Sequence, residues 1–343
     1  MVRVAIDAMG GDYAPAEIVK GTVEALQERT QISAVLVGDE AAIRRELDKG
    51  SWPEDRITIR HASEMIEMAE PPVMAIRRKK DSSMVRGMQL VRDGEADAFI
   101  SGGNSGAVMV GGQAIVGRIR GIERPPFAAL MPTRKGVILA LDCGANVDCR
   151  AEHLVSFARM GSIYMRDVAG IPNPRVGILN IGAEEDKGNA LVKEAYPLLE
   201  SCEDIRFTGS CEARDVPEGV CDVLVCDGFA GNIVLKMYEG VASALLASVK
   251  EGLMSSLRSK IGALLIKPAL KGTLKTFNTD SYGGAPVLGL KGLVVKIHGN
   301  AKAIVVKNAI LQCETFCEQN ITEKIRTNIA EQNTKKQADE KEN

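Results

Sequence analysis

Aromatic residues are scarce in this chain: they make up 4% of its 343 residues, with a single tryptophan. So few rings leave little material for the stacking platforms on which proteins hold single-stranded nucleic acid. Net charge of one sign is also absent, because 43 Lys and Arg residues are balanced by 45 Asp and Glu residues. Without an overall basic field, we expect no nucleic-acid partner. The apolar fraction of 45% excludes a disordered chain.

Histidines and paired cysteines are also few. The chain has three histidines, His61, His153 and His298, and none of its eight cysteines has a neighbour at the two-residue spacing of a zinc knuckle or redox dithiol. We therefore expect no metal, no disulfide framework and no cofactor. No apolar signal segment follows Met1, so we expect a cytoplasmic protein with reduced thiols.

The common motifs of nucleotide-binding and hydrolytic enzymes are missing. There is no G-x-x-x-x-G-K-[ST] sequence, and no G-x-G-x-x-G follows the first apolar run. Gly103-Asn104-Ser105-Gly106 resembles a nucleophile elbow but lacks the residue between the serine and the second glycine. These absences disfavour a nucleotide P-loop and a Ser-His-Asp hydrolase.

Short apolar runs recur along the chain, and each leads into a glycine-containing loop and a helix-like segment. We expect strands at residues 2–6, 34–37, 98–100, 137–141, 176–180 and 223–225. Among the helices that follow, we expect one from Pro15 to about 28, one at 152–166 and one at 233–250. This alternation predicts an α/β fold, a Rossmann-like α/β/α sandwich with a mainly parallel sheet. The longest uncharged run, 98–117, fits a strand, loop and helix of a soluble fold rather than a membrane span.

Two segments depart from this rhythm, and we otherwise expect residues 1–330 to form one large α/β domain. Residues 252–279 contain no carboxylate, have apolar residues at near-helical spacing, and include Pro268, which should kink or split the helix. The cations of this segment are Arg258, Lys260, Lys267, Lys271 and Lys275. They suit a basic amphipathic projection that contacts an anionic membrane or an acidic protein. Helices packed on the body or on a second subunit are an equal alternative. Residues 331–343 have one apolar residue, Ala338, and we expect a disordered polar tail.

Small polar residues and glycines follow the expected strands, at the sheet edge where ligands of parallel sheets bind. Backbone N–H groups and helix N-termini there favour anions. The candidate ligand-binding residues are Gly10, Gly11, Asp12, Gly103, Asn104, Ser105, Asp142, Asn146, Asn189, Asp227 and Asn232. For any single loop, helix capping is the better interpretation of an Asn or Ser. Convergence of several loops favours an anionic ligand, of which phosphate is the simplest.

Lys187 follows the expected strand at 176–180, among Glu184, Glu185 and Asp186 and directly before Gly188. It is either a solvated charge paired with a neighbouring carboxylate or a cation that holds phosphate or a developing oxyanion.

Taken together and in order, these loops resemble those of the bacterial phosphate acyltransferases, which transfer a fatty acyl group from acyl carrier protein to inorganic phosphate. The resemblance covers residues 2 to about 325 and is carried by residues 7–12, 101–106, 124–126, 141–146, 181–189, 227–232 and 282–286. It implies a fold related to isocitrate and isopropylmalate dehydrogenases and to phosphotransacetylase, usually in a homodimer. It also implies that acyl phosphate is made for phospholipid synthesis, with a glycerol-3-phosphate acyltransferase downstream.

The resemblance also implies roles for individual residues. Lys187 and Asn232 match the positions proposed to carry catalysis, and Asn104, Ser105, Asp142 and Asn146 match loops that line the cleft. The basic segment matches a helical projection implicated in contact with the carrier protein or the inner face of the cell membrane. Because a thioester is already activated, phosphate can attack its carbonyl directly, without a protein nucleophile.

Three other functions fit parts of the same pattern. A decarboxylating dehydrogenase would need a dinucleotide site and metal-binding carboxylates, for which Asp222 and Asp227 are the only obvious pair. A short-chain phosphotransacetylase would need neither a long apolar tunnel nor a basic docking surface. A peripheral membrane scaffold would use the amphipathic segment alone.

Overall fold

The structure is a computed structural model that describes residues 1–276 and 283–342, with side chains up to 269, from 283 to 332 and at 334. Its named strands form two sheets, whereas we expected one. Both sheets are mostly parallel, so the predicted α/β fold class is confirmed. The division into two sheets depends on pairings between strands far apart in the chain, which local apolar patterns do not report.

The first sheet has the order β10-β11-β4-β1-β2-β3, and all its neighbours are parallel except β10 and β11. Its strands are β1 (Val2–Asp7), β2 (Ile32–Gly38), β3 (Ile57–His61), β4 (Ala98–Ser101), β10 (Ala285–Pro286) and β11 (Leu293–Lys296). The helices of this half are α1 (Ala16–Glu28), α2 (Glu40–Leu47), α3 (Pro72–Arg78), α4 (Ser83–Arg92), α5 (Ser105–Gly111), a π-helical turn (Gly112–Val116) and α10 (Ala303–Glu318). The uncharged run 98–117 therefore forms a strand, a loop and a helix, as predicted.

The second sheet has the order β5-β6-β9-β7-β8, and only β5 and β6 run antiparallel. Its strands are β5 (Ala128–Thr133), β6 (Gly136–Leu141), β7 (Arg175–Asn180), β8 (Arg206–Glu212) and β9 (Val223–Val225). The helices beside it are α6 (Ala151–Asp167), α7 (Ala190–Glu200) and a 3₁₀ helix (Ala213–Glu218). Large side chains of α6, including Phe157 and Tyr164, are fully buried and belong to a hydrophobic cluster that spans both halves.

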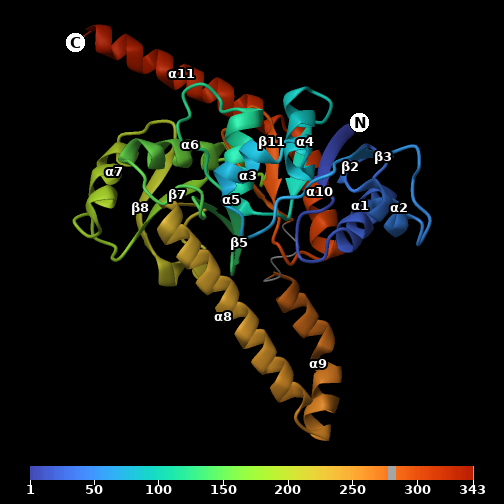
Figure 1. The fold of residues 1–343 in the computed structure, drawn as a ribbon. Helices are drawn as coiled ribbons and strands as arrows, with labels where there is room; N and C mark the ends of the chain where they lie inside the picture. The colour runs from blue at the N-terminus through green and yellow to red at the C-terminus, as the bar shows by residue number, and fades with distance from the viewer. Residues whose placement is uncertain (277–282, 343) are drawn as a thin grey trace.

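Two long helices, α8 (Gly228–Met254) and α9 (Leu257–Thr276), extend away from the body as a hairpin (Figure 1). α8 begins five residues before the predicted start at Ile233, because the side chain of Asp227 caps it by accepting a hydrogen bond from Ala230 N (2.7 Å). The helices separate at residues 255–256 and not at Pro268, which lies within α9. Because this part of α9 is exposed, water can bind the carbonyl group that Pro268 leaves without a donor.

α8 is long and apolar enough to cross a membrane, and none of its apolar window is buried in the body. Length and composition alone are weak evidence for a membrane span.

The last helix, α11 (Ile321–Glu342), runs through most of the segment that we expected to be disordered, and Asn343 lies outside the described residues. That expectation came from the lack of apolar residues. The same residues are mainly Glu, Lys, Gln and Ala, which have high intrinsic helix propensity.

Candidate functional site

The loops that follow β1, β4 and β11 meet at one edge of the first sheet. Asp12 N donates a hydrogen bond to Gly299 O (2.7 Å). Gly11 has a φ of +116°, and a Cβ on it would lie 2.8 Å from Gly299 O, so only glycine fits this approach. Gly10 and Gly103 pack against each other in the same group of loops. The predicted convergence of Gly10, Gly11, Asp12 and Gly103 is therefore present, and Gly299 joins them.

The buried carboxylate of Asp7, at the end of β1, fixes two of these loops through hydrogen bonds. Asp7 is 2% exposed and accepts hydrogen bonds from Ser101 Oγ (2.7 Å) and Met9 N (3.2 Å). Ser101 Oγ in turn accepts one from Gly103 N (3.0 Å). Burial raises the pKa of Asp7 above its ordinary value, against hydrogen bonds from Ser83, Ser101 and Met9 that lower it.

The loop after β6 is built around Asp142, whose side chain is fully buried. Its carboxylate accepts hydrogen bonds from Phe127 N (2.9 Å), Ala145 N (3.1 Å), Asn146 N (2.6 Å) and Asn146 Nδ2 (2.8 Å). Burial raises the pKa of Asp142 to about 6, while these donors lower it. At neutral pH Asp142 is therefore ionised, and its oxygen atoms accept hydrogen bonds from the protein itself.

The first turns of α8 pack against this loop. Gly228 N donates to Asn146 O (2.7 Å). Gly144 has a φ of +113°, and a Cβ on it would lie 3.5 Å from the carboxamide of Asn232. Asn232 therefore lies on the helix beside the 142–146 loop, and not in a loop of its own as we expected.

A cavity of about 430 Å³ lies between the two groups of loops. The first half contributes Ser105 and the second half Asn232, both predicted site residues. Three ionisable residues that the sequence did not single out also line the cavity, Lys236, Glu239 and Lys296, together with His298, one of the three histidines. Two signals were present in the sequence, because Lys296 is the only charge in residues 293–297 and His298 precedes Gly299 directly after that apolar run.

The ionisable groups of this cavity have distinct environments. Burial lowers the pKa of Lys296 to about 8, although the charge of Asp7 opposes this shift. Glu239 of α8 lies 3.2 Å from His298 Nε2, which joins the hairpin base to the loop after β11. Burial and the charge of Asp142 raise the pKa of the Cys143 thiol far above its usual range, so this lining residue stays protonated.

Several predicted residues serve as caps and braces. The side chains of Asn104, Asn189 and Asp227 accept hydrogen bonds from the first turns of α5, α7 and α8. Asn104 also donates to Met68 O and Glu70 O (3.0 Å each), and Asn146 donates to Pro125 O (2.9 Å). The capping interpretation is correct for Asn104 and Asn189, whereas Asn146 caps no helix and braces its own loop instead.

Lys187 is exposed in the 181–189 loop and is not among the residues that line the cavity. The loop is held by the side chain of Asn180 at the end of β7, whose Nδ2 donates to Lys187 O (3.3 Å), and by the backbone hydrogen bond from Lys187 N to Glu184 O (3.2 Å). The structure therefore does not bring Lys187 into the cavity with Asn232. Its catalytic role stays a prediction.

The cations of the hairpin are partly described. Arg258, Lys260 and Lys267 are exposed on α9, whereas the side chains of Lys271 and Lys275 lie outside the described residues. Large apolar side chains are exposed beside them, among them Leu257 (76%), Leu264 (69%) and Leu265 (77%).

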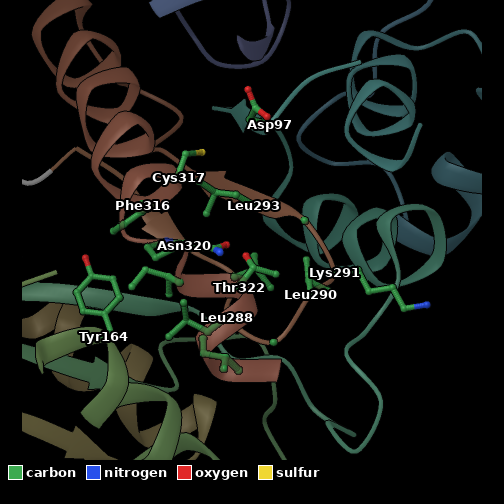
Figure 2. A pocket seen from close by; sticks show the side chains of 16 residues that line it. Asp97, Tyr164, Leu288, Leu290, Lys291, Leu293, Phe316, Cys317, Asn320 and Thr322 are labelled. Atoms are coloured by element: carbon green, nitrogen blue, oxygen red, sulfur yellow. The ribbon is translucent and has the colours of Figure 1, made fainter. Parts of the chain in front are cut away.

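Two other cavities differ in chemistry and position. One of about 230 Å³ contains Asp97, at the amino end of β4, with Leu288, Leu293 and Phe316 (Figure 2). Its lining mixes polar and apolar residues and lies beside the amino ends of β4 and β11. The other, of about 880 Å³, is lined partly by α6 and contains the ion pair between Arg159 and Asp204 (2.9 Å). Neither is lined by the loops that contain Gly103, Gly144 and Gly299.

A metal-dependent site finds no support in the described part of the chain, where no three His, Cys, Asp or Glu residues could hold an ion together. Asp222 and Asp227 lie at opposite ends of β9, and Asp222 is paired with Arg175 (2.9 Å). They cannot form the metal-binding pair of a decarboxylating dehydrogenase.

Comparison with known proteins decides the family. Residues 2–324 match the family model described as "Fatty acid synthesis protein". A phosphate acyltransferase of Clostridium novyi is 46% identical over 328 residues, covering 96% of this chain and 98% of that protein. One from Clostridium botulinum is 48% identical over 326 residues, covering 95% and 97%. The chain belongs to the phosphate acyltransferase family. It is therefore an acyltransferase, and the resemblance seen in its loops is confirmed.

Solved structures agree on the fold of this phosphate acyltransferase family member. A phosphotransacetylase from Streptococcus pyogenes has a TM-score of 0.60 at 18% identity, covering 92% of this chain and 94% of that one. The EutD phosphotransacetylase from Staphylococcus aureus has a TM-score of 0.58 at 18% identity, with the same coverage. At this identity the likeness shows a shared fold.

Proposed function

We propose that this chain transfers a fatty acyl group from acyl carrier protein to inorganic phosphate and releases acyl phosphate. The observation that carries the proposal is the cavity between the two sheets, where convergent loops, Ser105 and Asn232 lie beside Lys236 and Lys296. Cations and loop amides in such a place suit an oxyanion. Membership of the phosphate acyltransferase family supports phosphate as the acyl acceptor.

The reaction is a direct displacement. A phosphate oxygen attacks the thioester carbonyl carbon, the carbon–sulfur bond breaks, and the departing thiolate takes up a proton to give the free carrier thiol. In this reaction Asn232, which lines the cavity, donates a hydrogen bond to the carbonyl oxygen as negative charge develops there. Cys143 lines the cavity but its protonated thiol is a poor nucleophile, which favours direct attack over an acyl-cysteine intermediate.

The hairpin supports a large acyl donor. α8 carries Asn232 near its start and exposed apolar side chains further out, such as Met237 (65%) and Leu245 (62%). Together with Arg258, Lys260 and Lys267 these side chains suit an acidic carrier protein or peripheral contact with an anionic membrane. We propose a cytoplasmic homodimer that can rest on the inner face of the membrane and supply acyl phosphate to a glycerol-3-phosphate acyltransferase.

The deciding experiment mixes the purified chain with long-chain acyl carrier protein and phosphate, and measures acyl phosphate and free carrier thiol. We expect both products in equal amounts, and neither when sulfate at matched ionic strength replaces phosphate. Acetyl-coenzyme A used in preference to acyl carrier protein would instead support a short-chain phosphotransacetylase. Vesicle binding without acyl phosphate formation would support a membrane scaffold.

A further inference from the structure

Lys296 is a cation without a close carboxylate partner. It ends β11 opposite Ser101 of β4, and its ammonium donates hydrogen bonds to Gly102 O (3.4 Å) and to Ile297 O. Among the described residues, no carboxylate lies within ion-pair distance of its Nζ. Burial of an ammonium is costly unless an anion compensates it, and the lowered pKa of Lys296 reports that cost.

The surroundings of Lys296 leave room for an anion. Lys296, Ser105, Gly144 and Asn232 line the same cavity, with residues from both halves of the molecule. Lys236 of α8 adds a second cation, whereas the carboxylate of Glu239 is already paired with His298. The cavity therefore has two cations and no unpaired carboxylate among its described lining residues.

The buried carboxylate of Asp7 interacts electrostatically with the ammonium of Lys296. Its charge attracts Lys296, and its hydrogen bond with Ser101 holds the strand end that faces Lys296 across the sheet. Asp7 is buried and absent from the cavity lining, so it cannot touch a ligand there. It can hold the ammonium of Lys296 in position.

We propose that Lys296 binds the phosphate substrate directly through its ammonium and that Asp7 is the residue that positions it. The inference rests on the proposed function and adds to it a phosphate-binding residue at the end of a strand of the first sheet. The competing explanation is structural: Lys296 would only tie β11 to the carbonyl groups of Gly102 and Ile297.

The test compares Lys296→Gln with Lys296→Arg and with the control Lys291→Gln, an exposed lysine in the turn before the same strand. Loss of a charge-assisted hydrogen bond should raise KM for phosphate about 10- to 100-fold in Lys296→Gln, with KM for the acyl donor unchanged. Lys296→Arg should recover part of the phosphate affinity, and Lys291→Gln should match the wild type. Asp7→Asn should raise the phosphate KM by a smaller factor. An unchanged phosphate KM in Lys296→Gln, or a rise equal to that for the acyl donor, would overturn the proposal.

A binding measurement separates this inference from the acyl-transfer reaction. Without any acyl donor, phosphate should raise the melting temperature of the wild type and of Lys291→Gln but not that of Lys296→Gln, against sulfate at matched ionic strength. A phosphate-dependent rise in a wild type that makes no acyl phosphate would uphold the site and reject the reaction. No rise in the wild type, or an equal rise in Lys296→Gln, would reject the site.

Discussion

The loops around the cavity and the α8–α9 hairpin use their side chains in opposite ways. Around the cavity, polar groups such as Asp142 and Asn104 are paired within the protein, often several times over. On the hairpin, apolar side chains such as Met237 and Leu265 are left exposed. Burying and pairing polar groups fixes a geometry, whereas exposed apolar surface beside cations is suited to a partner. α8 joins the two regions, since its first turns reach the cavity and its far end forms the hairpin.

The strongest test of this contrast is Asp142→Ala. The change leaves three backbone N–H groups and the amide of Asn146 without their buried acceptor, at a cost of about 3 kcal/mol or more in the free energy of unfolding. Urea unfolding should show a lower midpoint, and acyl transfer should be lost with the loop geometry. Asp148→Ala, an exposed carboxylate in the same segment, is the control. Equal stability of the two variants would contradict the bracing role.

The second test separates turnover from folding at Asn232. Removal of one oxyanion donor lowers turnover about 100- to 1,000-fold, so Asn232→Ala should lose most acyl phosphate formation at an unchanged melting temperature. Ser248→Ala, an exposed residue further along α8, should behave as the wild type. Near-normal turnover of Asn232→Ala would reject its role.

Lys187→Ala tests the role implied by resemblance against the exposed position of this lysine. We expect a large loss of turnover with the fold intact, since its side chain supports no buried contact of the described structure. Circular dichroism and the acyl phosphate assay decide this together. Activity within a few-fold of the wild type would remove Lys187 from the mechanism. Lys236 and Lys296 would then be the cations that bind phosphate.

Substitutions of the hairpin cations should change partner binding and leave stability and phosphate affinity unchanged. Charge reversal by Lys260→Glu with Lys267→Glu should raise KM for acyl carrier protein several-fold and reduce binding to anionic vesicles, because both surfaces are negative. Stability and the phosphate KM should not change. Lys135→Glu with Lys193→Glu makes the same charge change on exposed positions of the body. If the two double variants behave alike, the hairpin cations are not a docking surface.

The smallest effect is expected at Cys143. Cys143→Ser keeps the size of a protonated thiol, so turnover should stay within about twofold of the wild type. Complete loss of acyl transfer, with an acyl group trapped on the wild-type cysteine in mass spectrometry, would instead establish a covalent intermediate.

Local patterns in the sequence were enough to predict many of the strands, the family and several helix caps of this protein. Apolar runs of three to five residues with glycine loops behind them predicted β1, β4, β6, β7 and β9, because burial and chain reversal leave local signatures. The ordered set of loops was also specific enough to indicate the family. Caps such as Asn189 could be interpreted from sequence, since a cap and its helix are neighbours in the chain.

Only the tertiary structure decided how those pieces combine. Strand pairing across long sequence distances divided them into two sheets and placed the cavity between the halves. It also brought Lys296 near Asp7, 289 positions earlier in the chain, and left Lys187 outside the cavity. The chemistry of a lysine depends on its burial and on the charges around it, and neither is encoded in the residues beside it.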